Sequence, residues 1–548
     1  MNCNATSISY RATGLFSNLV NDYVELKPEA LEFTEYASTI QGYQKAIEQR
    51  AAFPIQRKVL VEVLQKQYQQ LESFVQPFKA LNQKTSFSLV NENISLLLKE
   101  NTFTITTAHQ PNIFTGPLYF FYKIIHAIQL AQELKKQFPN NNFVPVYYMG
   151  SEDADLQEVG SFNLAGTLYE WKTNQKGAVG RMKVDDALIT LLQNLEGYWS
   201  VKPSGKEALE ILKQSYQKGM TIAEATLSLV HAYFGKYGLV VVQPDHAHLK
   251  SLFVDIMTKE LLEGFSQKAI QVTKENLAKT YHLQSQGRDI NLFYLKENLR
   301  NRIEKKGNEY IVVDSHIRFT EKEILEEINL HPERFSPNVI LRGVYQETIL
   351  PSISFIGGGG ELAYWMQLKN VFNQSKVHYP ILQLRNSFMF LSEKQTSSWI
   401  QLGFTLEDLF QPASDLELQY LKKESKENLL LAHHITTLHK LYHAIEKDVV
   451  KIDPTLAEHT KSLSTQAQKK LVALEKKMIR AEKRKHKISI DRIRSIKSSL
   501  FPNSSLQERV ENYSEWVGVY GWDWVETIMK FSTTLHPSFT IITIGKNL

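Results

Sequence analysis

The sequence predicts an α/β protein in which a mainly parallel sheet is followed by a long helical region. Between residues 101 and about 385, short β-type runs alternate with helix-type patterns, and this order of strand, helix and strand is typical of βαβ units. Beyond residue 392 the pattern becomes helical and increasingly charged, and residues 466–500 form the clearest long-helix pattern in the chain. We therefore expect two parts that are built differently.

The alternating region begins with the pattern that supports the fold class most directly. The run FTITTA reads as a strand, the apolar stretch after it as a helix of roughly 18 residues, and VPVYYMG as the next strand. A second helical pattern leads into the β-type run LVVVQPD. The two helices are expected over PLYFFYKIIHAIQLAQEL and TIAEATLSLVHAYFGKYG. Right-handed crossovers between parallel strands would bring the loops that follow the strands to one edge of the sheet.

Changes of pattern along the chain divide it into four segments. Residues 1–100 read as a mostly helical N-terminal part of the core, because apolar residues recur there at spacings of three and four. Residues 101–391 form the α/β core, and a turn-rich, β-rich insertion is expected around 162–200. Residues 392–502 are expected to form an α-helical coiled-coil domain. Residues 503–548 return to the core, with FTIITIG as a final strand.

The charged helical region carries a heptad-like pattern that Lys485 interrupts and that continues in a shifted phase from Ile493. Its a/d residues are Leu471, Leu474, Met478, Ala481 and Ile488 before the shift, and Ile493, Ile496 and Leu500 after it. We expect an antiparallel helical pair whose second helix comes from about residues 416–450. Pro502 ends the pattern.

Composition limits the classes of function. The 548 residues include 63 Lys and Arg against 58 Asp and Glu, a net charge of +5 that is too small to indicate nucleic acid unless the charges cluster. The single cysteine, Cys3, excludes an intramolecular disulfide and a cysteine metal cluster, which favours a reducing cytoplasm. No leader pattern and no run of about 18 uncharged apolar residues occur, so we expect neither export nor a membrane span.

The loop AHQPNIFTG, between the first predicted strand and helix, is the first candidate binding site. His109, Gln110 and Asn112 offer hydrogen-bonding side chains, and Gly116 lets the backbone approach a ligand just before a helix N-terminus, which favours anions. Spacings of three and four place part of a polar set on one face of the following helix. That set is Tyr119, Tyr122, Lys123 and His126. A lone loop histidine is more often a capping or surface residue, so this loop alone does not define a site.

Acidic side chains follow the next predicted strand. The segment SEDADLQEV contains Glu152, Asp153 and Asp155, which suit an ammonium group or a divalent metal. Neighbouring acidic residues are usually solvated. Two polar loops that converge on one strand edge nevertheless favour a binding site at that edge.

A glycine-rich turn is the second candidate site. In SISFIGGGGELAYWMQLKNVF, a β-type run leads into four glycines, beginning with Gly357 and Gly358, and then into a helix that opens with Glu361. The backbone N–H groups of such a turn can face a phosphate or a carboxylate. A tight turn that serves only close packing has the same composition.

Residues 469–497 contain twelve Lys or Arg residues and three acidic residues, a local excess of +9. A helical pair that stands in solvent needs polar faces, and this stretch has no aromatic residues for base stacking, so nucleic acid is not the expected partner. A non-catalytic protein that binds nucleic acid or a nucleotide through this basic coiled coil is the alternative function.

Several long motifs occur together in a characteristic order. They are AHQPNIFTGPLYFFYKIIHAIQLAQEL, VPVYYMGSEDADLQEV, INLFYLKENLRNRIE, YQETILPSISFIGGGGELAYWMQLK and SLQERVENY. In this order they resemble the cysteine ligases of bacillithiol biosynthesis, the BshC family, most clearly from about residue 100 to the end. The resemblance implies a Rossmann-like core similar to class I synthetase nucleotidyltransferases, an inserted connecting subdomain, a C-terminal coiled coil and a homodimer.

The resemblance also implies an activity. Members of this family are ligases assigned to add L-cysteine to glucosaminyl-malate, which forms an amide bond in the last step of bacillithiol biosynthesis. Because amide formation in water is uphill, the cysteine carboxyl group is expected to be activated, and the likeness to synthetases suggests adenylation by ATP. ATP or ADP and Mg²⁺ stay open as cofactors, and no residue is assigned as a metal ligand. We expect a cytoplasmic protein with small-molecule substrates and no membrane or nucleic-acid partner.

The resemblance gives the candidate residues roles. The catalytic residues that it implies are His109 and Gln110 near the α-phosphate, Lys123 against the charge that develops there, and Asp153. The substrate-binding residues that it implies are Asn112, Gly116, Tyr119, Glu152, Asp155, Gly357, Gly358, Glu361, Tyr364, Gln367, Arg385 and Asn386. Arg385 would bind the malyl carboxylates, because a guanidinium can bind a carboxylate with two hydrogen bonds.

Overall fold

A computed structural model describes residues 1–74, 87–281, 288–425 and 429–545. The chain folds into two compact units. The first unit comprises residues 1–389 and 506–542, and the second comprises residues 390–505 with a short C-terminal segment that begins at Thr543. The candidate site residues all belong to the first unit.

The centre of the first unit is a five-stranded parallel sheet with the order β13-β12-β2-β3-β6. Its strands are β2 (Thr102–His109), β3 (Asn142–Met149), β6 (Val240–Val242), β12 (Ser352–Gly357) and β13 (Ile381–Leu384). Numbered along the chain, this is the 3-2-1-4-5 order of a Rossmann-like sheet, which reverses direction between β2 and β12. The prediction of an α/β protein with a mainly parallel sheet is confirmed.

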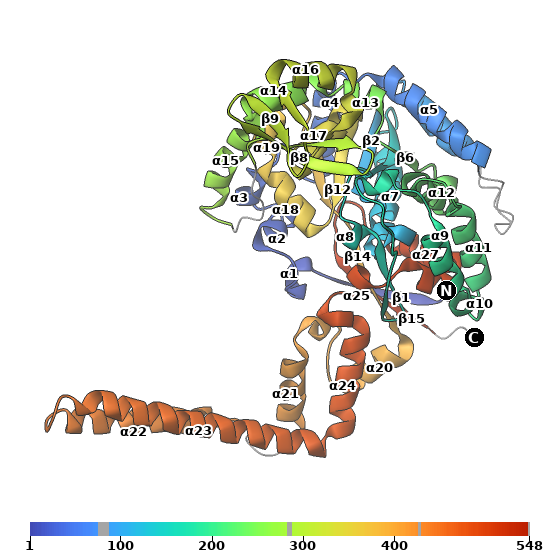
Figure 1. Ribbon diagram of the computed structural model, residues 1–548. Coiled ribbons are helices and arrows are strands. Elements are labelled where there is room, and N and C mark those ends of the chain that lie inside the picture. The colour runs from blue at the N-terminus through green and yellow to red at the C-terminus, as the bar shows by residue number, and fades with distance from the viewer. Residues whose placement is uncertain (75–86, 282–287, 426–428, 546–548) are drawn as a thin grey trace. The chain divides into compact units, whose positions relative to one another are not determined.

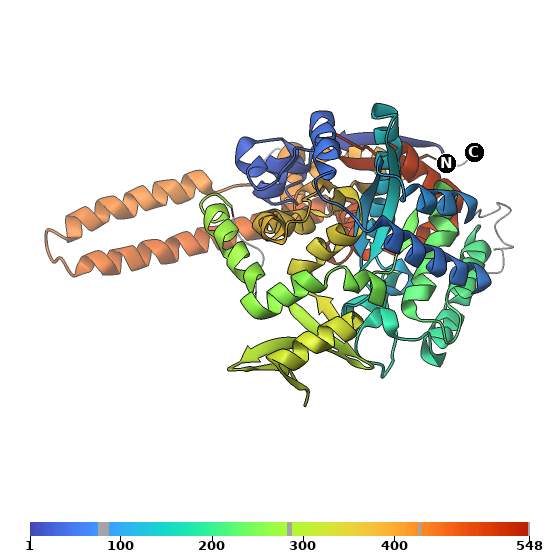
Figure 2. The same cartoon turned by 90° about the horizontal axis from the view of Figure 1, so that it is seen from above.

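Both faces of this sheet are covered by helices (Figures 1 and 2). Every residue of β12 is buried, as are the first six residues of β2, which explains why these strands read as continuous apolar and Thr-rich runs. Helix α7 (Tyr119–Gln137) packs on β2 and β3, and α4 (Ile40–Arg50) packs on β12 and β13. Apolar side chains from these helices and strands form one buried cluster that includes Tyr43, Ile105, Leu130 and Ile353.

Further helices of the first unit lie along its sequence. They are α2 (Asn18–Val24), α5 (Arg57–Phe74), α6 (Phe87–Leu96), α8 (Leu156–Val159), α11 (Gly205–Ser215), α12 (Ile222–Phe234), α13 (Ala247–Ser251), α14 (Val254–Glu263), α15 (Phe265–Leu277), α17 (Val339–Ile349), α18 (Gly359–Gln367), α19 (Lys369–Ser375), α25 (Gln507–Val510), α26 (Tyr513–Tyr520) and α27 (Trp522–Phe531). No helix in the described part of the chain is long and apolar enough to cross a membrane.

An antiparallel sheet of five strands lies between β6 and β12 in the sequence, with the order β10-β9-β8-β7-β11. Its strands are β7 (Leu292–Lys296), β8 (Leu299–Lys306), β9 (Glu309–Val312), β10 (Arg318–Thr320) and β11 (Phe335–Pro337), and α16 (Glu321–Leu330) follows β10. We did not predict this sheet. Charged residues such as those of LRNRIEKK in β8 obscure the apolar alternation, because most of that strand is only partly buried.

The expected β-rich insertion around 162–200 contains a single hairpin and then more helix than strand. A short hairpin of β4 (Ser161–Leu164) and β5 (Thr167–Glu170) is followed by α9 (Asp186–Asn194) and α10 (Glu196–Ser200). The Asp185 side chain caps α9 by accepting a hydrogen bond from the backbone N–H of Leu188 at 3.0 Å. The glycines and lysines before Asp185 hid this helix start.

The first strand of the chain lies within the segment that we expected to be helical. β1 (Cys3–Ile8) belongs to a three-stranded sheet with the order β1-β15-β14, whose other members are β15 (Phe539–Ile544) and β14 (Ser387–Ser392). The β1 side chains are mostly exposed, so no apolar alternation marks the strand. Its partner comes from the far end of the chain, where the predicted strand FTIITIG forms β15.

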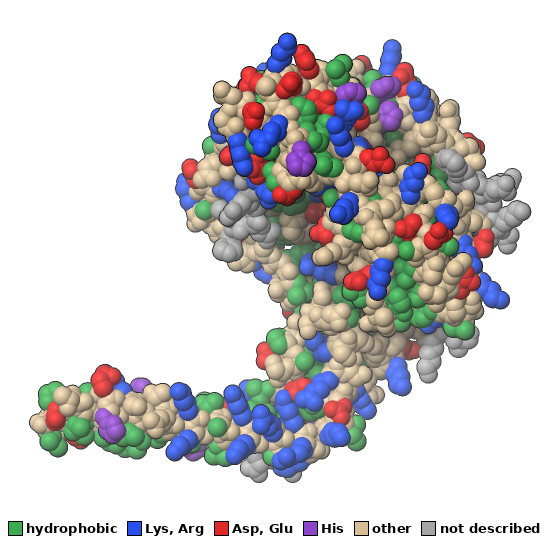
Figure 3. All heavy atoms as spheres, in the orientation of Figure 1, with side chains coloured by type: hydrophobic (Ala, Val, Ile, Leu, Met, Phe, Trp, Pro, Cys, Tyr) green, Lys and Arg blue, Asp and Glu red, His purple; other side chains and the backbone are tan. Residues whose placement is uncertain are grey.

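The second unit is helical, which confirms the C-terminal coiled-coil domain (Figure 2). Its longer helices are α20 (Glu393–Gln401), α21 (Ala413–Glu424), α22 (Ala432–Val449), α23 (Leu456–Lys485) and α24 (Lys487–Leu500). Helices α22 and α23 lie side by side as a hairpin, and α21 packs against α24. Lys and Arg side chains gather along α23 and α24, as Figure 3 shows.

The single long helix predicted over 466–500 is wrong, because the chain breaks at His486 into α23 and α24. The break accounts for the shift of the heptad phase. Ile490, Ile493 and Ile496 are buried, whereas Ile488 of the predicted a/d set is 78% exposed. Glu417 of α21 accepts a hydrogen bond from Arg494 Nε at 2.7 Å, which ties α21 to α24.

Candidate active site

The loop after β2 has a strained backbone. Phe114, Thr115 and Gly116 all have positive φ angles, of 49°, 65° and 65°. A left-handed conformation is costly for a phenylalanine and more so for a β-branched threonine, so surrounding contacts must hold the loop in place. At Gly116 a Cβ atom would lie 3.0 Å from Asn112 Cβ, which favours glycine for a second reason.

Those contacts come from two distant segments. The Asn512 side-chain amide donates hydrogen bonds to the carbonyl oxygens of Phe114 at 2.9 Å and Gly116 at 2.6 Å. The backbone N–H of Phe114 donates to the Tyr216 hydroxyl at 2.9 Å. Asn112 is buried within this loop. The structure thus places Asn112 and Gly116 in the framework of the loop, and neither contributes to the lining of the pocket described next.

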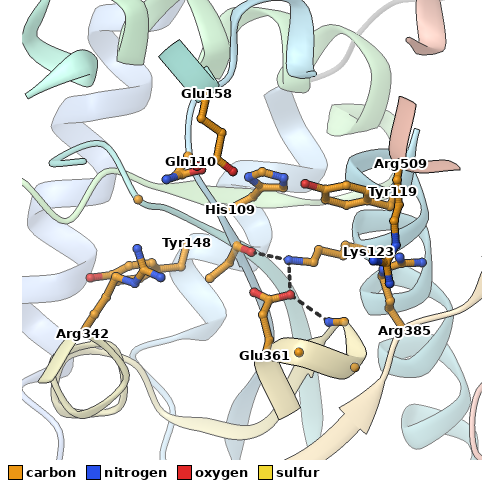
Figure 4. A pocket seen from close by; sticks show the side chains of 15 residues that line it. His109, Gln110, Tyr119, Lys123, Tyr148, Glu158, Arg342, Glu361, Arg385 and Arg509 are labelled. Atoms are coloured by element: carbon orange, nitrogen blue, oxygen red, sulfur yellow. Dashed lines mark hydrogen bonds and ion pairs between the residues drawn. The ribbon is translucent and has the colours of Figure 1, made fainter. Parts of the chain in front are cut away.

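A pocket of about 450 Å³ opens where β2 and β12 end, at the reversal point of the parallel sheet (Figure 4). Ligands of open α/β sheets bind at this position, because the loops on either side of it diverge. The pocket is lined by Ala108, His109, Gln110, Tyr119, Lys123, Tyr148, Gly150, Glu158, Arg342, Gly358, Gly359, Gly360, Glu361, Arg385 and Arg509.

Lys123 and Glu361 join the two halves of the sheet across this pocket. Lys123 Nζ lies 2.5 Å from Glu361 Oε2 and donates a hydrogen bond to the Ala108 carbonyl oxygen at 2.9 Å. The same Glu361 oxygen accepts a hydrogen bond from the Gly358 N–H at 2.8 Å, so it caps the start of α18. Burial lowers the pKa of Lys123, and the charge of Glu361 opposes that shift.

His109 stacks on Tyr119, with ring centroids 5.3 Å apart and an interplanar angle of 8°. Burial, with the nearby charges of Lys123 and Arg342, holds the pKa of His109 well below its usual 6.5. His109 is therefore neutral at physiological pH. Its Nε2 atom is buried and has no hydrogen-bond partner among the residues that the structure describes. A buried polar atom without a partner beside a pocket points to a ligand or a water at that place.

Arg385 already has a carboxylate partner. Its guanidinium donates hydrogen bonds to Glu508 Oε1 at 2.6 Å and Oε2 at 3.0 Å, and its centre lies 5.2 Å from the Tyr119 ring. Burial disfavours the charged form, but Glu508 outweighs it and raises the pKa of Arg385. Asn386 lies outside the pocket lining, and its side chain donates to the Thr533 carbonyl oxygen at 2.8 Å.

Each of the three acidic residues after β3 already interacts with another group of the chain. Glu152 pairs with Lys250, and burial raises the pKa of Glu152 against the opposing charge of Lys250. Asp153 pairs with Arg342 at 2.9 Å and with Arg300 at 3.3 Å. Asp155 caps the short helix α8 by accepting the Glu158 N–H at 3.2 Å. None of the three lines the pocket.

This arrangement does not fit a divalent metal held by these carboxylates. Two of the three are neutralised by basic partners, and within residues 1–74, 87–281, 288–425 and 429–545 no cluster of three His, Cys, Asp or Glu side chains is placed to hold a metal ion. Asp153 acts on the pocket through Arg342, which lines it.

The remaining predicted residues lie around the glycine turn. Gly358 and Glu361 line the pocket, and the Gly357 carbonyl oxygen accepts the Arg385 N–H at 2.8 Å. Tyr364 lies beside Arg342; burial raises the pKa of Tyr364, and the guanidinium charge opposes this. The Gln367 side chain donates to the Ala363 carbonyl oxygen of its own helix at 3.0 Å and is absent from the pocket lining.

Four polar side chains of the pocket lining were not among the predicted site residues: Tyr148, Glu158, Arg342 and Arg509. Arg342 is the lone cation in the apolar helix VILRGVYQETI, a signal that could have identified it. Glu158 and Arg509 lie in two of the motifs quoted above, DLQEV and SLQERVENY. Arg509 reaches the pocket from a segment more than 100 residues beyond the core strands, and no local pattern predicts that approach.

A 3-2-1-4-5 parallel sheet with a charged pocket at its reversal point defines a Rossmann-like protein, a class in which ligands bind at this position. Residues 1–386 match the family described as "Bacillithiol biosynthesis BshC, N-terminal Rossmann-like domain", and residues 388–544 match "Bacillithiol biosynthesis BshC, C-terminal coiled-coil domain". The chain belongs to the BshC family.

Relatives match over nearly the whole chain. A protein of Flavobacterium psychrophilum named "Putative cysteine ligase BshC" is 39% identical over 541 residues, 98% of each chain. A protein of the same name from Flavobacterium johnsoniae is 37% identical and covers 98% of this chain and 99% of its own. A more distant one, from Bacillus cytotoxicus, is 24% identical over 96% of this chain and 97% of its own.

Proposed function

We propose that this chain is a ligase that joins the carboxyl group of L-cysteine to the amine of glucosaminyl-malate and so forms bacillithiol. The observation that carries the proposal is membership of the BshC family over nearly the full length, together with a charged pocket at the reversal point of the sheet. The alternative of a non-catalytic protein that acts through its basic coiled coil is not favoured by this membership.

The charges of the pocket suit the groups of these substrates. Lys123, Arg342, Arg385 and Arg509 give it four cations, and Glu158 and Glu361 give it two carboxylates. The malyl group carries carboxylates, and activation of a carboxyl group adds phosphate. Three of the cations pair with carboxylates of the chain, whereas Arg509 is exposed and forms no ion pair within the described residues. Arg509 is therefore the better candidate for the malyl carboxylates, and Arg385 holds Glu508, its neighbour in the chain.

We assign roles to the chain's own residues as follows. His109 and Gln110 bind the activated carboxyl group of cysteine, and the neutral imidazole does so as a hydrogen-bonding group. Lys123, held by Glu361, stabilises negative charge that develops on the carbonyl oxygen of the reacting carboxyl group. Tyr119 supports the His109 ring by stacking, and Asp153 orients Arg342.

A nucleoside triphosphate is the expected source of activation, because a free carboxylate does not react with an amine in water. The cationic lining fits the charge of phosphate groups. Bound there, the nucleotide would supply a good leaving group on the cysteine carboxyl carbon. A cytoplasmic location and a homodimer stay predictions.

The test is direct. Purified protein is incubated with cysteine, glucosaminyl-malate and ATP, and bacillithiol is measured by mass spectrometry. The His109→Ala variant should lose most of the product, whereas a surface variant such as Lys206→Ala should not. A wild-type protein that makes no product with any nucleoside triphosphate contradicts the proposed function, and undiminished product from His109→Ala contradicts the site.

A further inference from the structure

We infer that Glu158 is the general base of the ligation, which takes the proton from the attacking amine of the acceptor. The inference rests on the proposed function and deepens it, because it divides the pocket into a part that activates cysteine and a part that prepares the amine.

Glu158 is placed for this role by a short helix at the rim of the pocket. Its carboxylate points toward Gln110 and His109, on the side of the pocket away from Glu361, as Figure 4 shows. Asp155 fixes the start of this helix through the hydrogen bond to the Glu158 N–H at 3.2 Å. The side chain therefore projects from an anchored turn and reaches the ligand space.

Glu158 also differs from Glu361, the other carboxylate that lines the pocket, and from two carboxylates behind the lining. Glu361 is bound to Lys123, Glu508 to Arg385, and Asp153 to two arginines. A carboxylate held by a cation is a weak base, because protonation would break its ion pair. Within the described residues Glu158 forms no ion pair, so its charge is available to an ammonium group or to a proton.

Amide formation requires such a proton acceptor. The acceptor nitrogen attacks the carbonyl carbon of activated cysteine, a C–N bond forms, and the C–O bond to the phosphate-containing leaving group breaks, with its electron pair going to that oxygen. The nitrogen must lose a proton for each amide formed. In this assignment the proton passes to a Glu158 oxygen and then to water. A nucleoside triphosphate supplies the activation, and the base consumes nothing.

The electrostatic surroundings make Glu158 a stronger base than an ordinary glutamate. Glu158 is exposed as a residue, but partial burial of its carboxyl group raises its pKa. The negative charges of Asp155 and Asp153 raise it further, and the Gln110 side chain opposes them. The titratable and charged groups that line the pocket with it include His109 at the end of β2, Tyr119 on α7, Arg342 on α17 and Arg509 on α25. Asp153 and Asp155 act on it from the segment before α8. A raised pKa makes a carboxylate a better acceptor.

His109 is the obvious rival for this role. Its pKa lies well below 6.5 because of burial and the neighbouring cations, so its imidazole binds a proton weakly. The two groups thus have opposite shifts within one pocket, which separates a hydrogen-bonding imidazole from a proton-accepting carboxylate.

The experiment compares two acceptors with the full-length protein. Hydroxylamine is largely unprotonated at neutral pH and traps activated cysteine as a hydroxamate without a base. Glu158→Gln should form the hydroxamate at a rate within about threefold of the wild type but should form bacillithiol at least about a hundredfold more slowly, which is the usual loss when a general base is removed. The matched control is Glu170→Gln, an exposed carboxylate on β5 outside the pocket.

The pH profile gives the second readout. In the wild type, kcat/KM should fall on the acid side with a midpoint above 4.5, the ordinary value for glutamic acid, and this limb should vanish in Glu158→Gln. Glu158→Asp should restore part of the rate and keep the limb. Bacillithiol formation by Glu158→Gln at the wild-type rate, or an equal loss of the hydroxamate and the amide, overturns the assignment. A wild type that forms neither product contradicts the proposed function instead.

Discussion

Lys123 Nζ lies 2.5 Å from Glu361 Oε2, and this ion pair joins the helix after β2 to the helix after β12. The Lys123 side chain is 5% exposed and that of Glu361 is 27% exposed. The pair therefore belongs to the framework of the pocket as well as to its charge.

Lys123→Met should lower the free energy of unfolding by about 3 kcal/mol, because it leaves the Glu361 carboxylate without its partner in a partly buried place. Adding Glu361→Gln should recover part of this loss. Activity should stay low in both variants if Lys123 acts on the substrate. Urea unfolding and turnover, measured on the wild type, each single variant and the double variant, separate the two effects. Full activity in the double variant would contradict a role for Lys123 in the reaction.

Glu347 should make stability depend on pH. It is buried in α17, and burial raises its pKa from 4.5 to about 8, opposed by Gln346 and Arg50. The folded protein holds a proton that the unfolded chain releases, so this contribution is fully present below pH 4.5 and is lost as pH rises through about 8. Relative to wild type, Glu347→Gln should therefore gain up to a few kcal/mol between these pH values. Chemical denaturation at several pH values measures this difference, and a difference that does not change with pH contradicts the prediction.

Asp153 should act through Arg342. Asp153→Asn removes the carboxylate that holds Arg342 at 2.9 Å, so kcat/KM should fall about tenfold or more through misplacement of the guanidinium. The same loss should appear in Arg342→Lys, and the double variant should be little worse than either single one. Additive losses in steady-state kinetics would show that the two residues act independently.

Substitution of Arg385 should affect stability, whereas substitution of Arg509 should affect substrate binding. Arg385→Gln leaves the fully buried Glu508 carboxylate without a counter-ion and should lower the free energy of unfolding by about 3–5 kcal/mol. Arg509→Gln, at an exposed position, should leave stability nearly unchanged and raise the KM for glucosaminyl-malate about tenfold. Thermal unfolding and steady-state kinetics test both; an unchanged KM in Arg509→Gln rules out its contact with the acceptor.

The sequence predicts the parallel core well because its signals are local. The run from β2 through α7 to β3 has strands of suitable length and a long apolar helix between them, and topology alone then places the loop of His109 next to the glycine turn of Gly358. What the sequence could not supply are partnerships between distant segments. Glu508 lies 123 positions from the arginine that it neutralises, so Arg385 read as free to bind a substrate carboxylate.

Exposure explains the other differences. β1 and β8 are strands whose side chains are largely exposed or only partly buried, and neither shows an alternating apolar pattern. The acidic residues that begin at Glu152 were predicted to bind a ligand. The sequence does not show that they already have basic partners, such as Lys250, which come from other elements. The break at His486 accounts for the phase shift in the heptad pattern. A phase shift alone does not distinguish one bent helix from two helices.

The hydrogen bonds from Asn512 to the loop of Phe114 and Gly116 determine when the pocket can form during synthesis of the chain. Nearly 400 residues separate the loop from the side chain that holds it, and the whole helical unit is translated between them. A nascent or truncated chain that ends before residue 508 lacks the anchor of the loop, the counter-ion of Arg385 and the guanidinium of Arg509. An incomplete chain therefore lacks three of the groups that form or support the pocket.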